Sequence, residues 1–214
     1  MDQILSRRER ERQIRKSEII GAARKLFLEK GFEETSMDDV AKESQFTKRT
    51  LYQYFVNKED LYYSVSIKES DLLNSYMAQA LEKKVNALEK LRLCCIAYYR
   101  FYEECPKSFR VISYNPNRKS NSESSPYFGE VMNYQRANYE KFLNVFAEGK
   151  RDGSIRPDID EKKAAYFGII TIQGFFYTLS AAETGYWDLY GFKKEDFIDF
   201  FIDNIVAAYA AKKA

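Results

Sequence analysis

Histidine is absent from the 214 residues of this chain. Histidine is the commonest general base near neutral pH and a frequent metal ligand, so its absence removes the usual catalytic triads and most metal sites. The sequence also contains no glycine-rich phosphate loop, no cysteine cluster with metal-ligand spacing and no nucleophile elbow. We therefore expect a protein that is not an enzyme and that carries no cofactor and no metal.

Cysteine is scarce, with only Cys94, Cys95 and Cys105 in the chain. An odd number with two adjacent residues is a poor disulfide framework, which indicates a reducing compartment. The charged N-terminal residues 1–16 include no apolar stretch that could act as a signal peptide. We expect a cytoplasmic protein whose cysteines behave as small hydrophobic residues, with redox sensing as the alternative.

A large excess of one charge is also missing, since the formal net charge is only +2. The local balance differs, because residues 1–16 carry six basic and three acidic side chains, and residues 45–58 carry three basic and no acidic ones. Clustered cations suit the phosphates of nucleic acid. The N-terminal extension is either a solvated, frayed helix or an arm that reaches DNA through Arg7, Arg8, Arg10 and Arg12.

The segment of residues 36–58 predicts two short helices that are joined by a tight turn. Ser36 followed by Asp39 is a capping-box pattern, so the first helix should begin at Met37. It has to end near Ser44, because a second start signal follows at once.

The second helix of this segment should start after Thr47, whose hydroxyl can cap it. Phe46 and Leu51 have the spacing of a hydrophobic staple, and Leu51 and Phe55 can point inward. The remaining side chains suit phosphates and base edges, so we interpret the segment as a helix-turn-helix with a recognition helix that presents Lys48, Arg49, Thr50, Tyr52, Gln53 and Tyr54.

The motif TKRTLYQYFVNKEDL resembles the signature of the TetR family of bacterial transcriptional regulators, and ARKLFLEKGFEETSMDDVAKES resembles the first two helices of that family. The match covers roughly residues 15–65. The family usually has Gly at the positions of Gln45 and Arg49. A non-glycine residue in a left-handed turn costs on the order of 1 kcal/mol, which is tolerable. Arg49 places a long cation on the DNA-facing surface, so the operator sequence of relatives does not carry over.

The resemblance implies a homodimer that binds a near-palindromic double-stranded DNA operator with half-sites about one helical turn apart or slightly more. It also implies DNA contacts by the Thr-Ser pair, by the recognition helix and by a phosphate-binding lysine. These candidate DNA-binding residues are Thr35, Ser36, Thr47, Lys48, Arg49, Thr50, Tyr52, Gln53, Tyr54 and Lys58.

Apolar periodicity, caps and breakers predict helices along the rest of the chain. The serine- and asparagine-rich residues 113–127 should form a loop, or alternatively a lid over a pocket. The helices are expected at about residues 14–30, 57–81, 87–105, 107–112, 126–150, 164–182 and 193–211.

Residues 164–182 include no charged side chain, a length that could span a membrane. Thr171, Gln173, Thr178 and two glycines favour a helix buried in a dimer interface instead. Together with the last helix it would form, as in the family, a four-helix bundle between two chains.

Aromatic residues are abundant, with 17 Tyr and 16 Phe. A buried tyrosine hydroxyl needs a partner, so a plain core would favour leucine over so many tyrosines. A pocket lined by aromatic rings explains the surplus, and a plain aromatic core is the alternative. The candidate ligand-binding residues are Tyr98, Tyr102, Tyr139, Phe142, Phe146 and Phe176.

The sequence therefore predicts an all-α protein. Residues 1–60 should form a three-helix helix-turn-helix DNA-binding domain with a charged N-terminal extension, and residues 61–214 a helical ligand-binding and dimerisation domain. The function that we expect is a ligand-responsive transcriptional repressor, released from its operator by a small lipophilic or aromatic effector. Control by a protein partner, or a TetR-like fold that has turned to small-molecule catalysis, are the alternatives.

Overall fold

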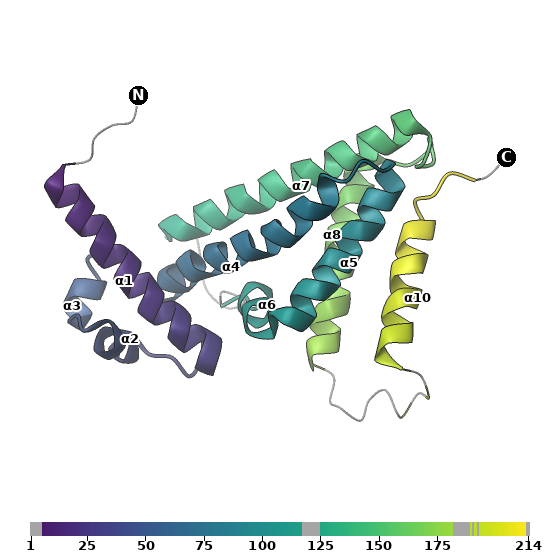
Figure 1. Cartoon of the computed structure of the whole chain (residues 1–214). Helices are drawn as coiled ribbons and strands as arrows, with labels where there is room; N and C mark the ends of the chain where they lie inside the picture. The colour runs from purple at the N-terminus through teal and green to yellow at the C-terminus, as the bar shows by residue number, and fades with distance from the viewer. Residues whose placement is uncertain (1–5, 117–124, 182–188, 190, 192, 213–214) are drawn as a thin grey trace. The chain divides into compact units, whose positions relative to one another are not determined.

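A computed structural model describes residues 6–116, 125–181, 189, 191 and 193–212. Within these residues the regular elements are helices, as predicted (Figure 1). In chain order they are α1 (Arg7–Lys30), α2 (Met37–Ser44), α3 (Lys48–Leu51), α4 (Lys58–Leu81), α5 (Ala87–Glu104), α6 (Pro106–Ser113), α7 (Pro126–Asp152), α8 (Glu161–Ala181) and α10 (Lys194–Ala207).

The chain forms two compact units, and each is built from two separate segments. The first unit comprises the described residues of Met1–Asp71 and Lys107–Asn133, and the second those of Leu72–Pro106 and Tyr134–Ala214. Helices α4 and α7 therefore each begin in the first unit and continue into the second. The segment that contains α6 and the start of α7 packs with the N-terminal helices, although it lies far from them in sequence.

Helix α1 begins at Arg7, so the start predicted near Ile14 is wrong. Ser6 accepts a hydrogen bond from the backbone N–H of Glu9, and the Glu9 carboxylate accepts one from the backbone N–H of Ser6. This capping box satisfies two N–H groups at the helix end and makes the early start favourable. The predicted end is confirmed, since α1 stops at Gly31 with a φ of 84°.

The core of the first unit forms around the apolar face predicted for α1. Ile19, Ala23 and Phe27 of that face are fully buried against side chains of α2, α3 and α4. Burial of each large apolar side chain contributes about 1.5–3 kcal/mol, so this cluster holds the small helices α2 and α3 in place.

Helix α6 docks on the same unit through polar and aromatic contacts. The Tyr62 hydroxyl donates to the carbonyl of Val111 at 2.8 Å, and the Arg110 guanidinium donates to the carbonyl of Leu28 at 2.6 Å. The Tyr114 ring lies 5.5 Å from that of Phe32. Burial is the main cause that raises the pKa of Tyr62, so its hydroxyl stays protonated as a donor.

Pro106 ends α5, as predicted, and it is also the first residue of α6, a position that suits proline because its missing N–H would have no helical partner. The predicted loop over residues 113–127 is shorter at both ends, because Ser113 is the last residue of α6 and Pro126 is the first residue of α7. Residues 117–124, and with them most of the lid considered as an alternative, lie outside the described residues.

Helix α5 packs against α8 and α10 in the second unit. Cys94 and Cys95 of α5 are buried, and burial raises the pKa of both thiols to about 12. A buried protonated thiol is a poor nucleophile, which favours the role of small hydrophobic residues over redox sensing for these two. No helix among the described residues is long and apolar enough to cross a membrane.

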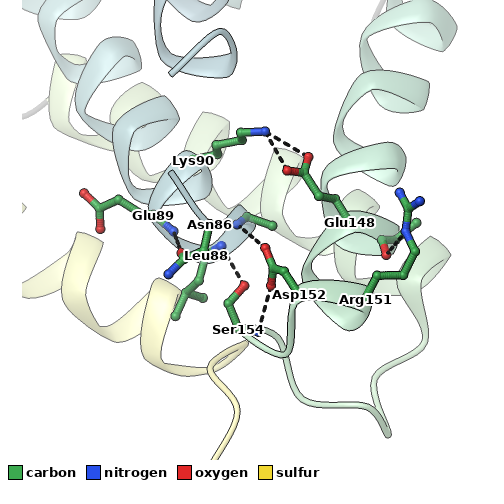
Figure 2. A network of polar contacts seen from close by, with 10 residues as sticks. Asn86, Leu88, Glu89, Lys90, Glu148, Arg151, Asp152 and Ser154 are labelled. Carbon is green, nitrogen blue, oxygen red and sulfur yellow. Dashed lines mark hydrogen bonds and ion pairs between the residues drawn. The ribbon is translucent and has the colours of Figure 1, made fainter. Parts of the chain in front are cut away.

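A set of polar side chains caps the start of α5 (Figure 2). The first three backbone N–H groups of the helix donate to Oδ2 of Asp152, Oγ of Ser154 and Oδ1 of Asn86, at 2.8, 3.2 and 2.9 Å. Lys90 and Glu148 add an ion pair at 2.7 Å beside them. Because helix N-termini leave such N–H groups without partners, this network fixes the turn after α7 against α5.

Asp152 makes this network pH-dependent. Partial burial opposes its ionisation, but hydrogen bonds from Ser154 and from the backbone N–H of Ala87 outweigh it, so the pKa of Asp152 lies below its ordinary value. A carboxylate with a depressed pKa stabilises the fold above its unfolded-state pKa and loses that contribution as the pH falls through the folded-state pKa.

We predict that Asp152→Ala lowers the free energy of unfolding at neutral pH by about 1 kcal/mol, as expected for the loss of a helix cap. The difference from wild type should shrink as the pH falls below about 4, the unfolded-state pKa of an aspartate. Urea unfolding across this pH range measures the difference. Asp158→Ala is the control, because among the described residues the Asp158 carboxylate pairs with nearby Arg156 alone. A difference that is independent of pH would contradict the role of the ionised carboxylate.

Candidate DNA-binding surface

Helix α2 begins and ends where the sequence predicts. The Ser36 hydroxyl accepts from the backbone N–H of Asp39 at 3.1 Å, and the Asp39 carboxylate accepts from that of Ser36 at 2.9 Å. The hydrogen bond from the backbone N–H of Ser36, and after it one from the Ser36 hydroxyl at 2.9 Å, lower the pKa of the Asp39 carboxylate. The capping box is confirmed and fixes the entry into the motif.

The turn between α2 and α3 depends on Gln45, which has φ 59° and ψ 25°. Among the described residues no other non-glycine residue has a positive φ. Its backbone N–H bonds to carbonyls of the last turn of α2 and so ends that helix. The left-handed turn predicted at this position is confirmed.

Helix α3 is shorter than the sequence predicts. Thr47 caps it as expected, accepting from the backbone N–H of Thr50 at 3.1 Å, but the helix ends at Leu51 and the next residues form turns. The backbone N–H groups of Tyr54 and Phe55 both donate to the carbonyl of Leu51, at 3.0 Å each. This tightening turns the chain so that Phe55 enters the core, where only 1% of it is exposed.

The three cations of the motif differ in what holds them. Lys48 forms an ion pair with Asp38 at 2.8 Å, and the hydrogen bond to Asp38 is the main cause that raises the pKa of Lys48. Lys58 donates to the carbonyl of Phe32 at 2.8 Å and lies 4.0 Å from the centre of its ring. The side chain of Arg49 is exposed and has no hydrogen-bonding or ionic partner among the described residues.

The other predicted DNA-binding residues divide into exposed and engaged side chains. Tyr52 and Gln53 are exposed. Thr35 is buried, and its hydroxyl donates to the carbonyl of Gly31 at 2.7 Å. The hydroxyls of Thr47 and Thr50 lie 2.9 Å apart and bond to each other. The structure thus places Arg49, Tyr52 and Gln53 as the freest polar groups of the motif.

Sequence reasoning missed Asp60 as the residue that secures the end of this motif. Its buried carboxylate accepts from the backbone N–H of Val56 at 3.1 Å, from the Ser125 hydroxyl at 2.6 Å and from the backbone N–H of Tyr127 at 3.2 Å. Asn57 caps α4 as predicted, through the backbone N–H of Asp60 at 2.7 Å. The cap spacing identified Asp60 only as a helix-start signal, because its partners beyond Val56 are 65 or more residues away.

The start of α7 packs on the same motif. The Tyr127 ring stacks on the Phe55 ring with 5.8 Å between their centres, and the ammonium group of Lys16 lies 4.9 Å from the centre of the Tyr127 ring. Phe128 contacts the ring of Tyr63 at 5.5 Å. The last residues of the motif are therefore enclosed by α1, α4 and the start of α7.

The candidate ligand-binding residues fall into two sets in the second unit. The Phe176 ring is fully buried and lies 5.4 Å from that of Tyr98 and 5.3 Å from that of Tyr102. On α7, the Phe146 ring contacts Tyr209 at 4.9 Å. Also on α7, Phe142 packs near Cys94, and the Tyr139 hydroxyl donates to the carbonyl of Lys162.

A capped helix, a left-handed turn and a short polar helix on an apolar brace define a helix-turn-helix DNA-binding fold. Residues 19–65 match the model of the bacterial regulatory proteins of the tetR family. The resemblance to this family that the motif residues indicated is confirmed over this segment of the chain.

One relative by sequence and two solved structures of similar fold illustrate the likeness. The HTH-type transcriptional repressor KstR2 of Mycolicibacterium smegmatis is 27% identical over 68% of this chain and 70% of its own length. The crystal structure of the transcriptional regulator FadR from Bacillus subtilis, in complex with stearoyl-CoA, has a TM-score of 0.66, 21% identity, and coverage of 89% and 97%. The crystal structure of AibR in complex with isovaleryl coenzyme A and operator DNA has a TM-score of 0.65, 19% identity, and coverage of 93% and 100%. KstR2 is named as a transcriptional repressor and FadR as a transcriptional regulator, and the AibR structure is named as a complex with operator DNA.

Proposed function

We propose that this protein is a ligand-responsive transcriptional regulator that represses its target genes and leaves its operator when a small lipophilic molecule binds. The observation that carries the proposal is the motif of residues 36–58, which presents free polar side chains on a firmly packed helix-turn-helix. A DNA-binding function also supports the cytoplasmic location expected from the sequence.

In this proposal the three cations of the motif have separate roles on DNA. Arg49 needs to break no contact in order to reach a base edge or a phosphate, so it contributes most to affinity. Lys48 must exchange Asp38 for a phosphate, which reduces its net contribution. Lys58 keeps its bond to Phe32 and contacts a phosphate with its remaining donors. The other predicted DNA-binding residues position the recognition segment on the DNA.

The proposed effector class is an acyl thioester of coenzyme A. Two proteins of similar fold are named as complexes with stearoyl-CoA and isovaleryl coenzyme A, which supports this class. The buried aromatic side chains around Phe176 offer an apolar environment for an acyl chain. The residues proposed to contact it are those predicted from the sequence: Tyr98, Tyr102, Tyr139, Phe142, Phe146 and Phe176.

The effector would act through the helices that the two units share. A ligand shifts an equilibrium only when it prefers one conformation, so it must favour a geometry that DNA disfavours. Helices α4 and α7 run from the second unit into the first, and there they contact the motif through Asp60 and Tyr127. A change in either helix therefore reaches the recognition segment directly.

We also propose that the protein is a homodimer through α8 and α10. Tyr166, Ile170 and Tyr177 follow helical spacing along α8 and are 61%, 46% and 46% exposed, and Phe167 and Phe200 are exposed as well. Exposed large apolar side chains in such a row mark an association surface. A dimer would present two recognition helices to one near-palindromic operator.

The DNA-binding proposal predicts that Arg49→Ala and Tyr52→Ala weaken binding to a duplex enriched by the protein from a random library of about 30 base pairs. Removal of a specific interaction with a base costs about 1–3 kcal/mol, or roughly 5- to 150-fold in affinity. Lys48→Ala should cost less, because Asp38 already neutralises this cation. Fluorescence anisotropy measures the affinities, with Lys68→Ala on α4 as the control that removes a cation elsewhere. Wild-type affinity in both the Arg49 and the Tyr52 variant would refute the assignment.

The dimer proposal predicts that sedimentation shows a dimer at micromolar concentration and that Ile170→Glu shifts it toward monomer, because a buried unpaired charge is costly. Val85→Glu, also at an exposed apolar residue, should leave the dimer intact. A stable wild-type monomer at this concentration would contradict the proposal.

The effector proposal predicts that long- or short-chain acyl-CoA binds and lowers affinity for the enriched duplex about 5- to 150-fold, the range of a typical allosteric coupling of 1–3 kcal/mol. Binding is followed by intrinsic fluorescence and DNA release by anisotropy, with free coenzyme A, fatty acids, lipophilic cations and neutral aromatics as comparisons. If one of the comparison compounds acts instead, the effector class is wrong. If no compound binds below millimolar concentration, control by a protein partner replaces the effector model.

A further inference from the structure

The first three turns of α1 carry a local excess of positive charge. Residues 7–16 include six basic and two acidic side chains. Both carboxylates are engaged: that of Glu9 in the capping box with Ser6, and that of Glu11 with Arg7 at 3.3 Å. The side chains of Arg8, Arg10 and Arg12 are exposed, and no carboxylate among the described residues pairs with them.

One side of these turns faces the recognition segment. The Arg12 guanidinium lies 5.8 Å from the centre of the Tyr54 ring, and Tyr54 follows α3 in the motif. Arg8 is four residues earlier and therefore lies on the same side of the helix, about 6 Å further along its axis. Figure 1 shows the first turns of α1 extending past α3. Arg7 and Arg10 point to other sides of the same turns.

Arg7 and Arg8 oppose the stability of the helix on which they stand. A helix N-terminus carries a partial positive charge whose effect falls off within the first turn, so cations in that turn are unfavourable. A local choice that works against the local structure is typical of functional positions. The first turns of α1 are nevertheless helical, because the capping box of Ser6 and Glu9 holds them.

We propose that Arg8 and Arg12 form a second DNA-binding site, which contacts the sugar–phosphate backbone beside the half-site that α3 reads. This inference rests on the proposed DNA-binding function and extends the interface to the N-terminal turns of α1. The side of α1 that carries Arg8 and Arg12 is continuous with the recognition segment through Tyr54, and its charge complements that of phosphates. Contacts of this kind carry no sequence information, so they add affinity without specificity.

The test compares Arg8→Gln/Arg12→Gln with Arg7→Gln/Arg10→Gln. Each double variant removes two charges from the same turns of α1 but on different sides of the helix, and of the four arginines only Arg7 pairs with a carboxylate among the described residues, that of Glu11. Affinity is measured over a range of salt concentrations for the enriched duplex and for an unrelated duplex of equal length. Circular dichroism checks that α1 stays helical. The single variant Arg8→Gln keeps the test valid if the Arg12 change disturbs Tyr54, because Arg8 has no carboxylate or ring partner among the described residues.

The slope of log affinity against log salt concentration should fall in magnitude by about 0.9 for each phosphate that the protein no longer neutralises. We expect nearly two such phosphates per protomer for Arg8→Gln/Arg12→Gln and clearly fewer for Arg7→Gln/Arg10→Gln. The preference for the enriched over the unrelated duplex should not change. Equal slopes in the two double variants would overturn the inference while Arg49→Ala still tests the recognition segment. If the wild type enriches no duplex, the proposed function fails and this inference fails with it.

Discussion

The DNA-binding unit depends on one buried carboxylate, that of Asp60. Only 1% of the residue is exposed, and its two oxygens accept three hydrogen bonds, from the end of the recognition motif and from the start of α7. A buried carboxylate is tolerated only when it is well hydrogen-bonded, so these three donors and Asp60 stabilise one another. The Asp60 carboxylate thus holds residues 56, 125 and 127 in a single arrangement, and the rings of Phe55 and Tyr127 stack beside them.

Features that local sequence determines were predictable. Helix-start and helix-stop signals act over three or four residues. They include capping boxes, a threonine cap, a proline that ends a helix and a glycine that follows a helix. For this reason α2, α4, α5 and the end of α1 lie close to where the sequence places them. The early start of α1 has the same kind of local signal, Ser6 followed by Glu9, but it lies among the charged residues that favoured a frayed extension. The left-handed Gln45 was predictable only through the resemblance to the family.

Features that distant residues determine were not predictable. The shortness of α3 follows from the burial of Phe55 and from the bond of Val56 to Asp60, which the motif pattern does not encode. The packing of residues 107–133 with the N-terminal helices rests on pairs such as Tyr62 with Val111 and Arg110 with Leu28, which are 49 and 82 residues apart. The pairing of Lys48 with Asp38 likewise requires coordinates, because opposite charges ten residues apart on two helices have no fixed geometry. Aromatic composition alone does not separate a pocket from a core, since the rings around Phe176 pack on one another.

The role of the Asp60 carboxylate is tested most directly by amide hydrogen exchange in Asp60→Asn, with Glu59→Gln as the matched control at the neighbouring residue. The side-chain amide of Asn places an N–H group where one carboxylate oxygen of Asp60 accepted a hydrogen bond. Two buried donors then face each other, which lowers the free energy of unfolding by about 1–3 kcal/mol. We expect faster exchange at Val56 and at Tyr127 together, although they are 71 residues apart in sequence, with little change in the control. Unchanged protection at both amides in Asp60→Asn would contradict the claim that this carboxylate joins the recognition motif to α7.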